Sequence, residues 1–153
     1  DFKEEFVGET FGRINKEEAH LLLKELEAYI LRIGGSRILE ERIDFGLISP
    51  YKAQVQYLRG KIKGSATLRP YRSLITVNTV DGFQGQERDV IFISLVRANE
   101  EGQIGFLNDL RRMNVAITRA RMKLVILGEA ATLGHHAFYK QLLEYVKKVN
   151  GRQ

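Results

Sequence analysis

The chain carries two polar segments, TVDGFQGQE (residues 79–87) and RRMNVAITRAR (residues 111–121), on either side of an apolar run. That run, residues 90–96, is almost continuously apolar, which is the pattern of a strand covered on both faces by other elements. Such strands occur in parallel sheets of α/β proteins, so this stretch predicts the fold class. We expect the remaining residues to form a scaffold that holds the two polar segments at a fixed separation.

Helical and strand patterns alternate on both sides of this stretch. Asn15 begins an apolar helical repeat, and Glu18, three residues later, completes an N-capping pattern. Gly34 and Gly35 are expected to end that helix. The other expected elements are strands at 45–49, 74–79 and 123–127, helices at 51–62, 108–120 and 135–149, and a basic loop at 64–72. This alternation predicts a mainly parallel α/β sheet wrapped by helices.

Composition limits the class of protein. A chain of 153 residues has the size of one domain, so we expect residues 1–153 to form a single domain. Hydrophobic residues make up 44% and charged residues 28%, and no apolar run is long enough to span a bilayer, so we expect neither disorder nor a membrane partner. The net charge of +5 favours an anionic partner such as nucleic acid or a nucleotide.

The chain has no cysteine, so it can form neither disulfides nor a thiolate zinc site. We therefore expect an intracellular location, cytoplasmic if the source is bacterial. It starts at Asp1 in a charged segment, without a methionine or a signal peptide. This start predicts a piece of a longer protein.

Candidate contacts to nucleic acid lie where the expected strands end, because ligands of open parallel sheets gather outside the carboxyl ends of the strands. Ser49 and Thr79 close two strands, and Arg97 follows a third, so hydroxyls and a cation can meet backbone phosphates. Tyr51, which follows Pro50, can stack on a base. The simpler alternative, favoured by position alone, is that both hydroxyls cap the next turn and the tyrosine packs half-buried.

Glu87 and Arg119 each lie a few residues before an expected strand, so both fall at the amino edge of a parallel sheet. A carboxylate can accept both hydroxyl hydrogens of a ribose, and a guanidinium can bind a terminal phosphate and stabilise the charge that develops there. The two residues can therefore share one ligand. The charge pattern by itself favours a solvated turn residue and an exposed helix face instead.

Gly82 and Gly85 flank Phe83 and Gln84 and allow a sharp turn or a close approach of the backbone to a ligand. The amide of Gln84 can bridge backbone groups because it offers both donors and an acceptor. A Gly-Phe-Gln-Gly segment alone is a weak indication of function.

Other catalytic patterns are missing from the sequence. No phosphate-binding loop of the form G-x-x-x-x-G-K-[ST] occurs, and no paired acidic residues end an apolar strand as magnesium ligands would. His135 and His136 are adjacent and so point in different directions, and His20 is far away in sequence, so we expect no metal site. This chain cannot bind and hydrolyse a nucleoside triphosphate unaided.

Taken together, these residues resemble the second RecA-like domain of superfamily I helicases, in the branch of the nonsense-mediated-decay RNA helicase and its DNA-helicase relatives. GLISPYKAQ (46–54) resembles motif IV, and TVDGFQGQERDVI (79–91) resembles motif V. GFLNDLRRMNVAITRAR (105–121) resembles motif VI, with VRAN (96–99) leading into it. The match covers residues 13–128, with three motifs in the family's order and in strand-loop settings.

The resemblance implies a RecA-like three-layer sandwich of the P-loop NTPase type that lacks its own P-loop. It implies that Arg119 is the arginine finger that reaches the γ-phosphate, that Glu87 holds the nucleotide ribose, and that Gly85 lets the backbone approach the nucleotide. It thereby favours the shared-ligand interpretation of Glu87 and Arg119 over the simpler one. The residues that it implies to touch the single strand are Thr79, Ser49, Pro50 and Tyr51.

Two departures from the family pattern bear on activity. Leu110 stands where relatives often have proline, and we expect little effect. The Walker motifs, the glutamine that reads adenine and a second arginine lie, in the family, upstream of the point where this chain begins. We therefore expect ATP and Mg²⁺ to be bound mainly by an N-terminal RecA-like domain of the same protein, and this piece alone to be inactive.

The resulting prediction is the C-terminal motor domain of an ATP-dependent helicase or translocase that acts on single-stranded DNA or RNA. Residues 79–87 would couple the nucleic-acid contact to the nucleotide contact. The alternative is a non-catalytic single-strand-binding module with a helicase-like fold and a steep salt dependence. A dinucleotide-binding enzyme lacks its glycine fingerprint here. Backbone contacts look alike for DNA and RNA, so the prediction covers both.

Overall fold

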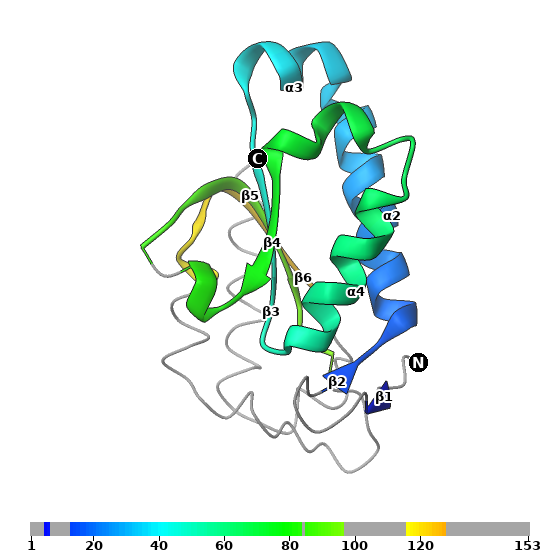
Figure 1. Ribbon diagram of the computed structural model, residues 1–153. Helices are drawn as coiled ribbons and strands as arrows, with labels where there is room; N and C mark the ends of the chain where they lie inside the picture. The colour runs from blue at the N-terminus through cyan, green and yellow to red at the C-terminus, as the bar shows by residue number, and fades with distance from the viewer. Residues whose placement is uncertain (1–4, 7–12, 84, 97–115, 128–153) are drawn as a thin grey trace.

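The computed structural model describes residues 5–6, 13–83, 85–96 and 116–127. Its centre is a four-stranded sheet in the order β4-β3-β5-β6, and all three strand pairs are parallel (Figure 1). The strands are β3 (Phe45–Ser49), β4 (Ile75–Thr79), β5 (Arg88–Ser94) and β6 (Ala120–Leu127). The parallel α/β sheet predicted from the sequence is confirmed.

The helix α2 (Lys16–Ile33) begins where the sequence predicts. The Asn15 side chain accepts a hydrogen bond from the Glu18 backbone N at 2.9 Å, which satisfies one amide at the start of the helix. The helix ends before Gly34, whose φ of 101° is a conformation that favours glycine. Leu22, Leu26 and Ile30 follow one another at helical spacing and form its buried face.

Two short elements between α2 and β4 were not predicted. The helix α3 (Gly35–Glu41) starts directly after Gly34, so the Gly34-Gly35 pair separates two helices instead of opening a loop. A 3₁₀ helix, η1 (Arg69–Leu74), replaces the second half of the expected basic loop, with Pro70 in its first turn, where a missing N–H costs nothing. Both segments are short, and neither has the periodicity that marks a longer helix.

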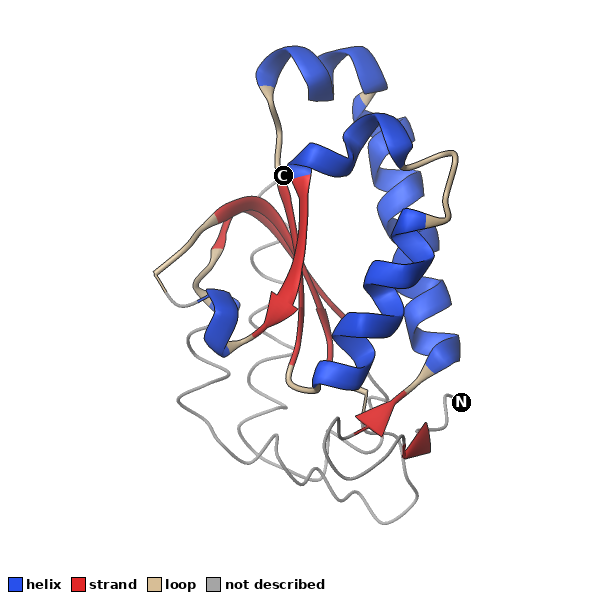
Figure 2. Cartoon of the chain, in the orientation of Figure 1, coloured by secondary structure: helices blue, strands red, loops and turns tan. Residues whose placement is uncertain are grey.

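The helix α4 (Lys52–Lys63) packs beside α2 on the same face of the sheet (Figures 1 and 2). One hydrophobic cluster fills the space between these helices and the sheet, and a second covers the opposite face. The first cluster includes Leu22, Leu58, Phe45 and Phe92, and the second includes Ile48, Ile91, Phe83 and Leu124. Alternate residues of β3 and β5 serve the two clusters, which explains their continuous apolar pattern.

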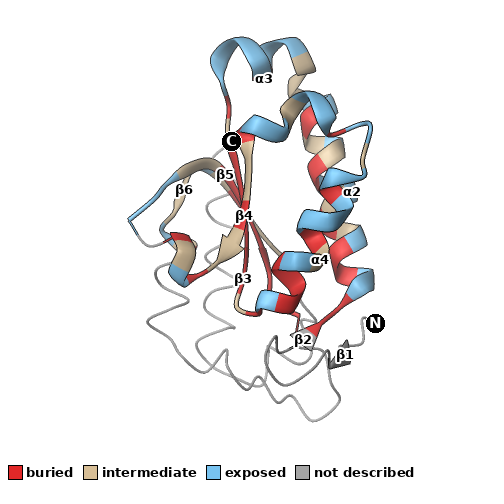
Figure 3. Cartoon of the chain, viewed as in Figure 1, coloured by how far each residue is buried: buried red, intermediate tan, exposed pale blue. Residues whose placement is uncertain are grey.

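The middle strands are the most deeply buried part of the molecule. Every residue of β3 is buried, whereas β4 and β6 are partly exposed (Figure 3). A separate antiparallel pair, β1 (Glu5–Phe6) and β2 (Arg13–Ile14), precedes α2 and was not predicted. In the ranges that the structure describes, no helix is long and apolar enough to cross a membrane.

Candidate functional site

The carboxyl edge of the sheet brings Ser49 and Thr79 together, as predicted, because they are register partners at the ends of β3 and β4. Ser49 is fully buried, and its hydroxyl accepts a hydrogen bond from the backbone N of Tyr51 at 3.4 Å. The Thr79 hydroxyl, half-buried, accepts from the backbone N of Gly82 at 3.3 Å. Both hydroxyls thus cap local turns, the simpler of the two interpretations made from sequence.

Pro50 and Tyr51, the two residues between β3 and α4, differ in exposure. Tyr51 is buried at 9% exposure, whereas Pro50 is partly exposed beside it. Contacts of Ser49, Pro50, Tyr51 and Thr79 with a single strand remain predictions. Pro50 and Thr79 are the two that reach the surface in this structure.

A buried polar network that the sequence did not predict lies behind this edge. The Glu18 carboxylate, which a capping box would turn back to the start of its own helix, instead accepts hydrogen bonds through Oε1 from the Ser94 hydroxyl (2.5 Å) and the Val96 backbone N (2.9 Å). Its other oxygen, Oε2, has no partner among the described residues. Burial raises the pKa of Glu18 from 4.5 to about 7 despite these hydrogen bonds.

Gln54 takes over the role that Glu18 would have in a capping box. Its Oε1 accepts from the Asn15 backbone N at 2.9 Å, and its Nε2 donates to the Asn15 carbonyl at 3.0 Å and to the Ser94 hydroxyl at 3.1 Å. The side-chain amide of Asn15 donates through Nδ2 to the carbonyl of Val96. Val96 has a φ of 71°, which is unusual for a β-branched residue. Side chains from α2 and α4 therefore hold the chain where it leaves β5.

The amino edge brings Glu87 and Arg119 together, as predicted. Arg88 and Ala120, the residues that follow them, are register partners, and the Arg88 backbone N donates to the Arg119 carbonyl at 2.9 Å. The Arg119 guanidinium donates to the carbonyl of Gln86 at 3.3 Å, next to Glu87. Glu87 is exposed and Arg119 is partly exposed, so both side chains are accessible to one ligand.

The backbone at Gly85 is suited to close approach by a ligand. Its φ of 78° favours glycine, and among the described residues, its chain neighbours aside, no atom lies within 4 Å of the position that a Cβ would take. An open backbone, a carboxylate and a guanidinium at one edge form a donor and acceptor set that fits a ribose and a phosphate. The described residues hold no group of three or more histidines, cysteines or carboxylates that could bind a metal ion.

An ion-pair cluster that the sequence did not predict ties three strands together at the same edge. Arg121 donates to Asp89 at 3.0 Å and to Asp44 at 3.2 Å, and each aspartate also accepts from the other's backbone N. The hydrogen bond to Asp89 raises the pKa of Arg121, and the charges of Asp44 and Glu87 add to the effect. Arg121 lies two residues after Arg119, so this cluster helps to hold the start of β6, the strand that directly follows Arg119, in place.

Residues 79–87 run from one edge of the sheet to the other, as predicted. They leave the carboxyl end of β4, form a short 3₁₀ helix, η2 (Asp81–Phe83), and reach the amino end of β5. The fully buried Phe83 ring anchors this segment against Gly46, where an added Cβ would lie 2.9 Å from the ring. The Arg88 guanidinium lies 5.5 Å from the centre of the same ring. A direct physical link between the two edges therefore exists.

Several sequence predictions fall outside the described residues: Gln84, Arg97, Leu110, the expected helix at 135–149 with His135 and His136, and most of the expected helix at 108–120. Of that last helix, only residues 116–117 are described as helical before β6 begins. Nε2 of His20, the remaining histidine, lies 3.0 Å from the Tyr57 hydroxyl.

Comparison with known proteins gives a consistent result. A family profile described as an AAA domain matches residues 2–131. The chain is 38% identical over 143 residues to the Arabidopsis thaliana protein named probable helicase MAGATAMA 3, and 38% identical over 149 residues to the Drosophila melanogaster regulator of nonsense transcripts 1 homolog. Over 88 residues it is 50% identical to the Saccharomyces cerevisiae DNA polymerase alpha-associated DNA helicase A.

These matches cover most of this chain but little of each relative. They span 94%, 95% and 58% of the chain, and 17%, 12% and 12% of the Arabidopsis, Drosophila and yeast proteins, respectively. The chain therefore corresponds to a small part of each of these relatives.

Proposed function

Because this chain belongs to the AAA domain family of helicases, in the branch of the nonsense-mediated-decay RNA helicase, we propose that it is the C-terminal motor domain of an ATP-dependent helicase or translocase. We propose further that residues 1–153 act as one domain within a longer protein. The observation that carries the proposal is the register of β5 and β6, which puts Glu87 and Arg119 side by side at one edge.

In this proposal the amino edge forms one wall of a cleft that binds ATP. A first RecA-like domain of the same protein would form the other wall and supply the phosphate-binding loop and the magnesium ligands. Arg119 would stabilise the charge that develops on the γ-phosphate, a contribution of about 10³ to 10⁵ in rate for such arginines. Glu87 would accept the ribose hydroxyl hydrogens, and Gly85 would let the backbone lie close to the nucleotide.

The carboxyl edge would carry part of the single-strand contact through Ser49, Pro50, Tyr51 and Thr79. Residues 79–87 connect this edge to Glu87, and the buried Phe83 ring packs the segment against the sheet, which supports a coupling role. The relatives' names mention both transcripts and DNA, so the proposed substrate is single-stranded DNA or RNA.

The test is nucleic-acid-stimulated ATP hydrolysis by three proteins: the full-length protein that carries this chain, the chain alone, and full-length Arg119→Ala. We expect activity only in the first. Arg37→Ala is the matched control, since Arg37 is an exposed arginine whose ion pair with Glu41 lies within α3. Substantial hydrolysis by the chain alone or by Arg119→Ala would refute the proposal.

A second candidate, a non-catalytic single-strand-binding module, rests on the missing phosphate-binding loop within these residues. The two candidates differ in one inspectable feature, a G-x-x-x-x-G-K-[ST] segment upstream in the full-length protein. Its absence there would favour the binding module.

A further inference from the structure

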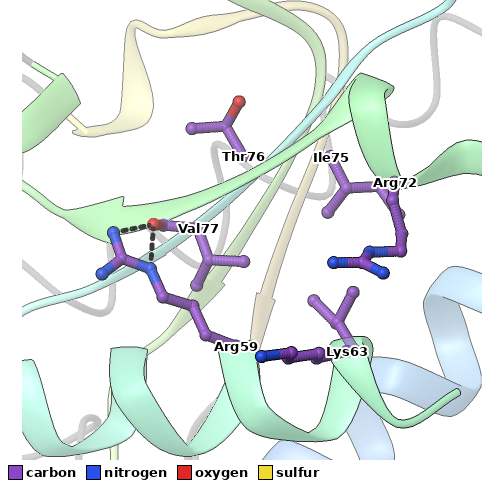
Figure 4. A pocket seen from close by; sticks show the side chains of 7 residues that line it. Arg59, Lys63, Arg72, Ile75, Thr76 and Val77 are labelled. Carbon is purple, nitrogen blue, oxygen red and sulfur yellow. Dashed lines mark hydrogen bonds between the residues drawn. The ribbon is translucent and has the colours of Figure 1, made fainter.

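The open flank of β4 carries a recess that none of the helicase motifs accounts for. It has a volume of about 420 Å³ and lies between the C-terminal half of α4, η1 and the first half of β4. Arg59 and Lys63 from α4, Arg72 from η1, and Ile75 and Val77 from β4 form most of its lining (Figure 4). Its lining combines three apolar side chains with three cations.

The charge of this recess is not balanced locally. Lys63 and Arg72 are exposed, and Figure 4 shows both side chains directed into the space between α4 and β4. None of the three cations forms an ion pair with a carboxylate within the described ranges. Among the described residues that line the recess, none is acidic either. Like charges held together without a counter-charge favour an anionic ligand.

Arg59 shows which kind of ligand fits. Its Nε and Nη2 both donate to the carbonyl of Val77, at 3.0 and 2.6 Å, and so cover the backbone edge where a further strand would pair. Its Nη1 makes no hydrogen bond among the described residues. The arrangement therefore opposes the addition of a peptide strand, while it leaves one guanidinium nitrogen for an anion.

We propose that this recess binds a backbone phosphate of the nucleic acid, on the flank of the sheet and beyond the predicted single-strand contact at the carboxyl edge. The proposal rests on the proposed function, because it assumes a nucleic-acid substrate. Residues 75–77 lie about 7 to 13 Å from Thr79 along β4, at roughly 3.3 Å per residue. A nucleic-acid strand that crosses the carboxyl edge of the sheet can therefore continue into the recess.

The recess suits the backbone and not the bases. None of the described residues that line it is aromatic, so they offer no surface for base stacking. Cations that contact phosphates contribute affinity without sequence preference, and they make binding depend steeply on salt. The expected contact is thus independent of sequence, as a translocating motor requires.

The test compares two double variants of the full-length protein, each of which removes two positive charges. Lys63→Gln with Arg72→Gln neutralises the recess, and Lys24→Gln with Arg32→Gln neutralises two exposed cations of α2. Binding of fluorescein-labelled oligo(dT) and oligo(U) is followed by fluorescence anisotropy over a salt series without ATP. Far-UV circular dichroism checks that both variants fold.

The slope of log K against log salt concentration is negative, and for single strands each lost phosphate contact makes it less steep by about 0.7. Because the recess holds one phosphate, the slope of the recess variant should be less steep by about 0.7, which corresponds to roughly 5-fold weaker binding at 0.1 M salt. The control variant should keep a slope close to that of the wild type. A recess variant that behaves like the control overturns the proposal.

Length dependence and ATP hydrolysis separate this inference from the proposed function. Oligonucleotides too short to reach past the carboxyl edge should bind the recess variant and the wild type equally. With long oligonucleotides, the recess variant should need more nucleic acid for half-maximal ATP hydrolysis but reach a similar maximal rate.

A wild-type protein that neither binds nucleic acid nor hydrolyses ATP refutes the proposed function itself. If the recess variant loses binding of labelled polyglutamate and not of oligonucleotides, the occupant is an acidic protein segment and the inference is wrong.

Discussion

Glu18 should make the stability of this domain fall as the pH rises. Its carboxyl group has no exposed surface, and the pKa is raised from 4.5 to about 7 because burial disfavours the charged form. The folded state therefore holds a proton that the unfolded state releases. The stabilisation linked to this proton is fully present below about pH 4.5 and is lost as the pH rises through about 7.

The size of the effect follows from the shift. At 1.36 kcal/mol for each pKa unit, a rise from 4.5 to about 7 corresponds to roughly 3 kcal/mol of unfolding free energy. Between about pH 5 and about pH 8 the domain should lose about 2.5 kcal/mol of it. This is a large part of the total stability of an ordinary domain.

The variant that isolates this effect is Glu18→Gln. The glutamine can keep the acceptor oxygen that Ser94 and Val96 use, but it cannot titrate. Urea unfolding of the 153-residue chain, followed by far-UV circular dichroism at several pH values, measures the free energy in each case. From about pH 5 to about pH 8, the unfolding free energy of the wild type should fall by about 2.5 kcal/mol relative to that of the variant.

Glu17→Gln is the matched control, because Glu17 lies in the same first turn of α2 but is exposed. It should retain the pH dependence of the wild type. If Glu18→Gln shows the same pH dependence as the wild type, or if both Glu17→Gln and Glu18→Gln abolish it, the reasoning from the burial of Glu18 is wrong.

Two further predictions concern glycines of the segments that define the site. Gly85→Ala should destabilise the chain by about 1 to 2 kcal/mol, because a φ of 78° is costly for any residue with a Cβ, and urea unfolding measures this loss. Gly46→Ala should cost about 1 to 3 kcal/mol, because its Cβ would lie 2.7 Å from Ile91 Cδ1 and 2.9 Å from the Phe83 ring; an unchanged thermal midpoint would contradict this.

The sequence predicted best the elements whose pattern is local. The strand at residues 45–49 was predicted with its observed bounds, and the cap at Asn15 was also correct. The strand predicted at 90–96 lies at Arg88–Ser94. Leu95 and Val96 are buried and apolar like strand residues, but Val96 has a positive φ that ends the extended conformation.

The start of β6 was placed three residues too late for a different reason. Ala120–Met122 interrupts the apolar pattern with a charged residue, Arg121, whose partners are Asp89 on β5 and Asp44 just before β3. Such a pairing is invisible in a local pattern. A strand that begins with polar residues can be recognised only once its neighbours are known.

The candidate site, like the fold, was predicted only in part. Strand ends and motif spacing predicted which edge each residue occupies, and the register of the sheet confirms those positions for Ser49, Thr79, Glu87 and Arg119. The buried network around Glu18 was missed because its members come from distant parts of the chain; Glu18 and Ser94 are 76 residues apart. In sequence, Glu18 is indistinguishable from an ordinary capping residue.

The strand order β4-β3-β5-β6 also bears on how the chain acquires its structure during synthesis. The first of these strands to leave the ribosome, β3, lies inside the sheet, β4 then pairs with one side of it, β5 with the other, and β6 with the outer side of β5. Each new strand meets an edge that is already present, so no earlier pairing has to open. Parallel pairs depend on contacts distant in sequence and form slowly, and outward growth from β3 spares this chain the additional delay of rearrangement.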